Sequence, residues 1–166
     1  MPCRSDQTMK LDDITPKVDA MELPNEILLK EVRTLIAEGH HVTLRVRGVS
    51  MRPFLEDRRD KVVLTKPRTP KVGDAVLAEI FPGKYVYHRI IAIEGDNVTL
   101  RGDGNVRGTE ECRLENVVAS TMAFIRKDKR YLPEGYAWRC YSALWPRWSF
   151  ARRVLLKLYR VFRCYR

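Results

Sequence analysis

The chain has 166 residues, of which 45% are hydrophobic, and it carries a formal net charge of +10 at pH 7. This length and apolar content predict one main domain with a single sizeable core. No stretch approaches the roughly 18–20 apolar residues that cross a bilayer as a helix, and the first residues are too polar for a secretory signal, so we expect neither a membrane-spanning nor an exported protein.

The cysteines are scattered, with no pair at the short spacing typical of metal ligands. They are Cys3, Cys112, Cys140 and Cys164. This pattern predicts reduced thiols and a cytoplasmic protein.

The N-terminal part of the chain is expected to hold one helix. Residues 1–22 are polar and lack periodicity, which predicts a mobile leader. A helix is predicted within residues 23–41, because Asn25 can cap its start, apolar residues then recur at intervals of three and four, and Gly39 can end it.

Short β-prone runs follow. The expected strands cover residues 42–46, 61–65, 75–80, 85–93, 98–101 and 117–125. Gly95 and Asp96, between two of these runs, indicate a hairpin-type turn. Residues 42–134 are therefore expected to form an antiparallel, mainly β domain, and the fold class is mainly β with α+β character at the two ends.

The positive charge belongs to the C-terminal end. Residues 135–166 contain eight Arg or Lys side chains and no acidic one, which leaves a net charge of +2 for residues 1–134. Apolar residues recur there at intervals of three and four and predict one face of a helix. They are Leu144, Trp148, Ala151, Leu155, Leu158, Tyr159 and Phe162.

A basic amphipathic helix is therefore predicted in residues 135–166. Through residues 142–166 it suits an anionic membrane surface, which would make the protein peripheral at the inner face of the membrane. Docking onto the protein's own core or onto an acidic partner protein is an equally open alternative. Nucleic acid, which mixed basic and aromatic side chains also bind, is the less favoured ligand.

Two residues of the β domain are candidate catalytic residues. Ser50 lies in a turn rich in Gly and Pro, and His88 lies in an alternating strand. A serine hydroxyl attacks a carbonyl usefully only when a neighbouring base takes its proton. Alone, Ser50 could merely cap a helical turn and His88 could be structural; together they predict a nucleophile and its base.

The stretch from Val46 to Val118 resembles the clan of serine peptidases that contains the type I signal peptidases and the self-cleaving LexA-like repressors. The first block of the clan, Gly-x-Ser-Met-x-Pro, is matched at Gly48, Ser50, Met51 and Pro53. The second block places the base just before an Arg-Ile pair. This chain has His88 there, similar to the endoplasmic-reticulum and archaeal signal peptidases, whereas bacterial members have Lys.

Two further blocks complete the resemblance. Gly73 and Asp74 open a segment similar to the clan's Gly-Asp-x-Val. Gly102, Asp103 and Asn105 match its Gly-Asp-x-Asn. Four blocks in the same order make an accidental match improbable.

The resemblance implies a LexA/signal-peptidase-like β domain and a serine peptidase, a hydrolase, with a Ser50–His88 dyad. The acid that orients His88 is left open among Asp103, Glu110 and Glu111, because the further Asp common in members with a His base is missing. Gly48 stands where some bacterial members carry a hydroxyl for the oxyanion, so that charge would rest on backbone N–H groups, chiefly that of Ser50. The implied substrate is a peptide or protein bound in extended form along a strand edge, and no metal or organic cofactor is implied.

Two other classes of function stay open. One is a LexA-like regulatory module that cleaves itself or only mediates dimerisation. The stretch of sequence before Val42 is shorter than a helix-turn-helix domain needs, which argues against a repressor. The other is a non-catalytic protein, with a degenerate site, whose basic tail binds membrane or nucleic acid.

Overall fold

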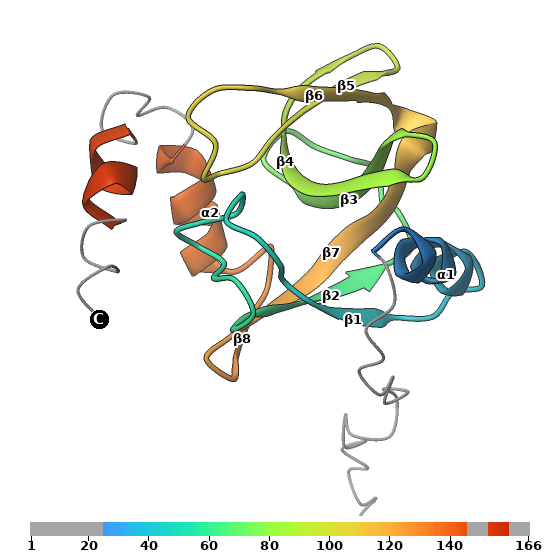
Figure 1. The fold of residues 1–166 in the computed structure, drawn as a ribbon, viewed down its shortest axis with the longest axis horizontal. Helices are drawn as coiled ribbons and strands as arrows, with labels where there is room; N and C mark the ends of the chain where they lie inside the picture. The colour runs from blue at the N-terminus through green and yellow to red at the C-terminus, as the bar shows by residue number, and fades with distance from the viewer. Residues whose placement is uncertain (1–24, 146–152, 160–166) are drawn as a thin grey trace, which may run out of the picture.

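The computed structural model describes residues 25–145 and 153–159, and Figure 1 shows their arrangement. The structure is mainly antiparallel β sheet with short helices towards both ends, which confirms the predicted fold class. The strands are β1 (Val42–Arg45), β2 (Lys61–Thr65), β3 (Ala75–Phe81), β4 (Lys84–Glu94), β5 (Asn97–Arg101), β6 (Glu110–Arg113), β7 (Val117–Arg126) and β8 (Lys129–Tyr131). The helices are α1 (Asn25–Ala37), a 3₁₀ turn (Leu114–Asn116), α2 (Tyr136–Leu144) and the helical residues 153–159.

All eight strands belong to one sheet, in the order β1-β2-β7-β3-β4-β5-β6, with β8 paired to β7. The long strand β7 joins the two halves, because its first residues pair with β3 and its later residues with β2. In Figure 1 it runs between the β3–β6 part and the β1–β2 part. The register shifts in the β2–β7, β3–β7 and β4–β5 pairings mark irregularities that bend and twist the strands, which lets the sheet curl.

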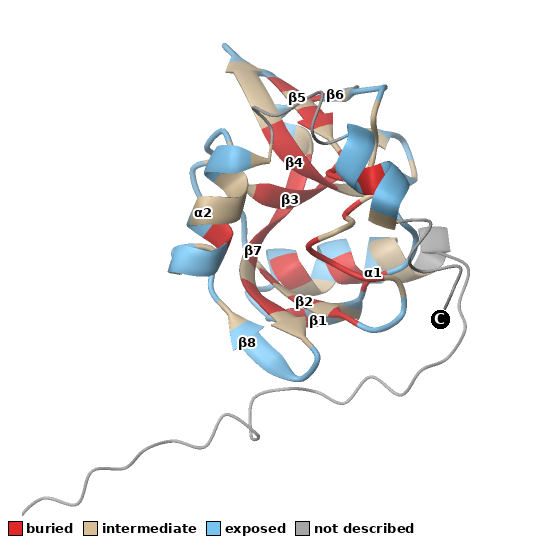
Figure 2. Cartoon of the chain, turned by 90° about the vertical axis from the view of Figure 1, so that its left-hand side faces the viewer, coloured by how far each residue is buried: buried red, intermediate tan, exposed pale blue. Residues whose placement is uncertain are grey.

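The curled sheet encloses two clusters of buried side chains. The larger cluster joins α1, β1, β2, β7 and α2. At its centre the ring of Phe54 lies 5.2 Å from that of Phe124 and 4.8 Å from that of Trp138. The smaller cluster lies among β3–β6 and includes Val76 and Ile90. Figure 2 shows buried residues concentrated along β3, β4 and β7, so β4, which carries His88, is closely packed.

The N-terminal helix and the hairpin are confirmed. Helix α1 buries Val32 and Ile36 against the sheet. It ends before Gly39, which adopts a φ of +94° that few residues other than glycine accept. Gly95 and Asp96 join β4 to β5 as predicted. The predicted leader, residues 1–22, lies outside the described residues.

Two strands, β6 and β8, were not predicted. Three of the four residues of β6 are charged, and only Cys112 is buried. β8 begins with Lys129 and Arg130, both exposed. Strands at a sheet edge keep one side in water and often carry charge, so they lack the apolar pattern that identifies an inner strand.

The C-terminal region differs from its prediction in two respects. Helix α2 begins at Tyr136, before the predicted apolar face, and is fixed by the buried Trp138. In residues 153–159 the side that packs on the domain carries Leu156 and Tyr159, whereas Leu155 and Leu158 of the predicted face are exposed. Trp148, Ala151 and Phe162 lie outside the described residues. No helix in the described ranges is long and apolar enough to span a lipid bilayer.

Candidate active site

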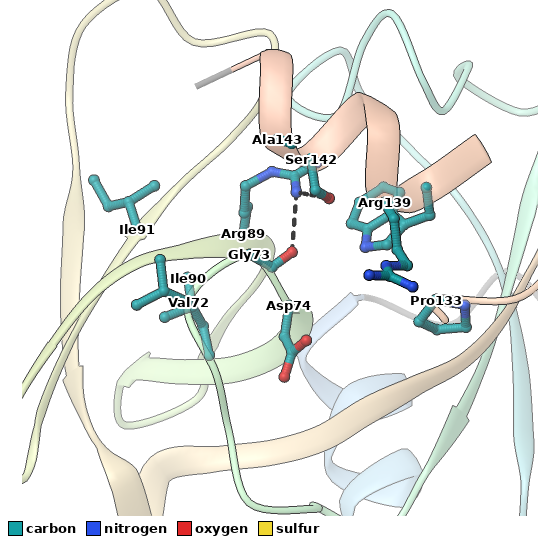
Figure 3. Close-up of a pocket in the computed structure, with 11 residues that line it drawn as sticks. Val72, Gly73, Asp74, Arg89, Ile90, Ile91, Pro133, Arg139, Ser142 and Ala143 are labelled. Carbon is teal, nitrogen blue, oxygen red and sulfur yellow. Dashed lines mark hydrogen bonds between the residues drawn. The ribbon is translucent and has the colours of Figure 1, made fainter. Parts of the chain in front are cut away.

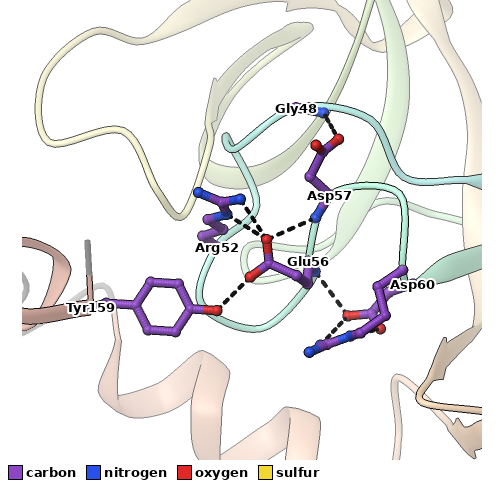
Figure 4. Close-up of polar contacts among 7 residues, drawn as sticks. Gly48, Arg52, Glu56, Asp57, Asp60 and Tyr159 are labelled. Atoms are coloured by element: carbon purple, nitrogen blue, oxygen red, sulfur yellow. Dashed lines mark hydrogen bonds and ion pairs between the residues drawn. The ribbon is translucent and has the colours of Figure 1, made fainter. Parts of the chain in front are cut away.

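Ser50 lies in the connection between β1 and β2, and its neighbours hold that connection in place. Met51, Phe54 and Leu55 are buried in the larger core. Gly48 has a φ of +88°, and its N–H donates to Asp57 Oδ1 at 2.7 Å (Figure 4). Since apolar anchors follow Ser50 and a hydrogen-bonded glycine precedes it, the half-buried Ser50 is held in a defined position.

The loop after β5 packs directly on this turn. The N–H of Gly104 donates to the carbonyl of Ser50 at 2.7 Å. A Cβ at Gly104 would come within 2.3 Å of the carbonyl oxygen of Val49, and one at Gly102 within 2.6 Å of the Ser50 oxygen. Only glycine fits at these two positions, which is the physical reason for the Gly-Asp-Gly sequence here.

His88 reaches the same place from β4. Arg89 pairs with Arg101 across the β4–β5 ladder, so the next residues along the two strands are His88 and Gly102. Gly102 in turn touches Ser50. The segment that follows β5 therefore links the Ser50 turn to the part of β4 that carries His88, although Ser50 and His88 are far apart in the sequence. Among the described residues neither Ser50 Oγ nor His88 Nε2 has a hydrogen-bond partner, so the two groups are not hydrogen-bonded to each other.

Glu110 is hydrogen-bonded to Nδ1 of the His88 imidazole. His88 Nδ1 lies 3.0 Å from Glu110 Oε2, with His88 buried and Glu110 partly exposed. A carboxylate can only accept a hydrogen bond, so Nδ1 carries the proton, and in the neutral ring Nε2 is left as an acceptor. Of the three predicted acids, Glu110 is the one that makes this contact. Glu111, the next residue on β6, is exposed, since successive side chains of a strand alternate between its faces.

Asp103 does not orient His88 but forms a buried ion pair with Arg89. Both oxygens of the Asp103 carboxylate accept from the Arg89 guanidinium, Oδ1 from Nε and Oδ2 from Nη2, each at 2.7 Å. Arg89 follows His88 in β4 and therefore points to the opposite face of the strand. Because Asp103 lies on the face of Arg89, its carboxylate is unavailable to His88.

The Arg89–Asp103 pair also ties the glycine loop to helix α2. Arg89 Nη1 donates to Ser142 Oγ and to the carbonyl of Gly73, and Trp145 Nε1 donates to the carbonyl of Asp103 at 2.9 Å. The guanidinium carbon lies 4.2 Å from the centre of the Trp138 ring. The pair thus fixes the loop that supports Ser50, a role that no motif in the sequence indicates.

The protonation states of Arg89 and Tyr141 in this network do not change near neutral pH. Burial alone would lower the pKa of Arg89, but the hydrogen bonds and the negative charge of Asp103 outweigh it and raise that pKa, so the guanidinium stays charged. Burial, and then the charge of Asp103, raise the pKa of Tyr141, so this phenol stays neutral beside the pair. The network is therefore a structural support at neutral pH and not a source of protons.

A second polar cluster follows the Ser50 turn. The buried Glu56 accepts hydrogen bonds from Arg52 Nε at 2.8 Å and from the hydroxyl of Tyr159. Figure 4 shows Arg52 and Tyr159 converging on this carboxylate from two sides. A cavity of about 270 Å³ beside it is lined by Val49, Arg52, Gly104, Leu156 and Tyr159. The helical residues 153–159 therefore lie next to the turn that carries Ser50.

A larger cavity, of about 430 Å³, opens between β4 and α2, and neither Ser50 nor His88 lines it (Figure 3). Arg89 lies at its edge, between Gly73 and Ser142. Burial raises the pKa of Asp74 in its wall, against the opposing effect of a hydrogen bond from the Lys71 N–H. We place the candidate chemistry at the Ser50 turn and the His88–Glu110 pair, which line neither cavity, because these adjoining segments supply a hydroxyl, an imidazole and a carboxylate.

Within the described ranges, no three His, Cys, Asp or Glu side chains are placed to share a metal ion. The sequence matches no known family model, and no curated protein matches it.

Proposed function

We propose that this protein is a serine endopeptidase in which Ser50 is the nucleophile, His88 the general base and Glu110 the acid that orients His88. One observation carries the proposal. The contact between His88 Nδ1 and Glu110 leaves Nε2 as the basic nitrogen of a neutral ring, and the Ser50 hydroxyl has no hydrogen-bond partner among the described residues.

The geometry supports the following sequence of steps. Ser50 Oγ attacks the carbonyl carbon of a peptide bond while its proton passes to His88 Nε2. The C–N bond then breaks as His88 returns that proton to the leaving amine. Water, deprotonated by His88 in the same way, attacks the ester; the bond to Ser50 Oγ then breaks as His88 returns the proton to that oxygen, and the acid is released. Glu110 stabilises the imidazolium at each stage through its hydrogen bond to Nδ1.

The negative charge on the carbonyl oxygen needs a donor. The backbone N–H of Ser50 donates no hydrogen bond to any described residue. It is therefore available to the oxyanion, and the hydrogen bond from Gly104 to the Ser50 carbonyl holds the turn rigid in the orientation required. We expect the substrate to be an extended peptide that pairs with a strand edge of this sheet.

The proposal is tested by labelling with an alkyl fluorophosphonate, which forms a bond from serine oxygen to phosphorus and loses fluoride. We expect one label per folded chain, on Ser50 by peptide mass spectrometry, and none in Ser50→Ala or in urea-unfolded protein. A folded wild-type protein that is not labelled, or is labelled elsewhere, would refute the peptidase proposal.

Glu110→Gln should slow labelling of Ser50 and peptide cleavage by about 10²- to 10⁴-fold while the protein stays folded. The amide keeps the shape of the side chain but loses the charge, and it can donate to Nδ1, which favours the tautomer with its proton on the wrong nitrogen. Both rates are to be measured beside the unfolding midpoint in urea.

The matched control for that experiment is Glu111→Gln, an identical change at the next, exposed position. It should leave both rates within about threefold of wild type, since Glu111 makes no contact with His88. Equal losses in the two variants would contradict the role given to Glu110.

We also propose that the protein acts in the cytoplasm. Cys112 and Cys140 are free thiols, as expected in a reducing compartment. Burial raises the pKa of the Cys112 thiol, which keeps it in the less reactive protonated form.

A further inference from the structure

The helical residues 153–159 pack on the domain with one narrow side only. Leu156 is buried and Tyr159 is half-buried, and these two residues face the Ser50 turn. The remaining five are all exposed. They include three large apolar side chains, Val154 at 44%, Leu155 at 47% and Leu158 at 47% exposure.

The exposed residues are ordered around the helix. Successive residues of an α-helix are about 100° apart, so Val154, Leu158 and Leu155 follow one another over about 100° of the surface. Arg153 and Lys157 fill the adjoining arc of about 40°. The outward surface is thus an apolar strip with a basic strip along one border, and we call these five residues the outer face.

The outer face is held firmly to the domain. The hydroxyl of Tyr159 donates to the buried carboxylate of Glu56, which also binds Arg52. Leu156 and Tyr159 close the cavity beside Val49 and Gly104. Whatever covers the outer face is consequently brought close to the turn that carries Ser50.

We propose that the outer face docks on an anionic lipid membrane. An amphipathic helix with leucine and valine on one strip and Arg and Lys beside it suits the boundary between lipid headgroups and acyl chains. The surrounding sequence has the matching charge, since residues 135–166 contain eight basic and no acidic side chains. This proposal goes beyond the peptidase activity and does not depend on it.

Two other occupants fit the outer face less well. A second copy of the chain would bring two equally basic surfaces together, and like charges repel. Nucleic acid would use Arg153 and Lys157 but would gain nothing from three exposed aliphatic side chains, which can neither bind phosphate nor stack on bases.

The test is co-sedimentation of the full chain with two kinds of vesicle, phosphatidylcholine alone and phosphatidylcholine mixed with phosphatidylglycerol, at low and high salt. We expect binding to the anionic, mixed vesicles that salt weakens but does not abolish, and weak binding to phosphatidylcholine alone. Leu158→Glu should weaken binding to anionic vesicles about tenfold or more, since it places a charge where an apolar group enters the membrane.

Leu132→Glu is the matched control, because Leu132 is 48% exposed and the change in net charge is the same. It should bind within about threefold of wild type, and circular dichroism should show both variants folded. Equal binding by the Leu158→Glu and Leu132→Glu variants, or no binding of wild type to anionic vesicles, would overturn the proposal. So would binding to a single-stranded oligonucleotide in place of vesicles, unaffected by Leu158→Glu.

Discussion

Alanine at Ser50, at His88 or at both positions should lower kcat for peptide cleavage by the same large factor, about 10⁴-fold or more. A nucleophile without a base is almost inactive, and a base without a nucleophile has nothing to activate. The proposed dyad requires the two side chains to act as one unit, so the double variant should be no slower than either single one. The measurement is cleavage of a library of extended peptides, with products quantified by mass spectrometry.

His41→Ala is the control for this experiment. His41 is exposed next to the start of β1, so its loss should leave turnover unchanged. Wild-type turnover by a folded His88→Ala protein would remove His88 from the mechanism. Losses that multiply in the double variant would show that Ser50 and His88 act independently, contrary to the dyad.

Asp103→Ala should lower the free energy of unfolding by about 3–5 kcal/mol. Arg89 and Asp103 are 1% and 2% exposed, so the substitution leaves a guanidinium buried with no carboxylate to neutralise it. It also removes the carboxylate that links the glycine loop to Arg89 while leaving the Trp145 hydrogen bond to the backbone carbonyl, so labelling of Ser50 should slow in the fraction that remains folded. Urea unfolding followed by tryptophan fluorescence measures the first effect, and fluorophosphonate labelling measures the second.

An exposed pair of the same chemistry provides the comparison. Arg68 and Glu134 form an ion pair at 3.1 Å with side chains 55% and 65% exposed, so Glu134→Ala should cost no more than about 1 kcal/mol. The double variant Arg89→Met, Asp103→Leu removes both buried charges and should be more stable than Asp103→Ala. If Asp103→Ala and Glu134→Ala proved equally mild, Arg89–Asp103 would not be the support that we describe.

The sequence was sufficient to predict the inner strands, because a strand with one buried face alternates apolar and polar residues. β2 was predicted to the residue, and β3, β4 and β7 to within a residue or so at each end. The edge strands β6 and β8 were not predicted, because one side of an edge strand faces solvent and can carry charged side chains. Ser50 and His88 were singled out from local motifs, and in the fold Ser50 lies against Gly102, one residue beyond the Arg89–Arg101 pair of the β4–β5 ladder.

The choice of the orienting acid could not be made from the sequence. Asp103, Glu110 and Glu111 are all close to the predicted strands, and distance along the chain does not distinguish them. The strand faces on which the side chains of β4 and β6 lie do distinguish the three acids. Alternation along β4 sends His88 and Arg89 to opposite sides, so Asp103 pairs with Arg89 and Glu110 is left for His88.

Tertiary contacts also decide which side of the helical residues 153–159 packs on the domain. Periodicity showed that the segment is amphipathic, but a helical pattern does not say what each face meets. The Tyr159 hydroxyl donates to the buried Glu56, which also binds Arg52, and with this contact Leu156 lies inward and Leu155 and Leu158 lie outward. Local patterns of polarity thus predicted the inner strands and the N-terminal helix, and local motifs the two candidate residues. The partners of Asp103, Glu110 and Tyr159 depended on contacts between distant parts of the chain, which only the fold brings together.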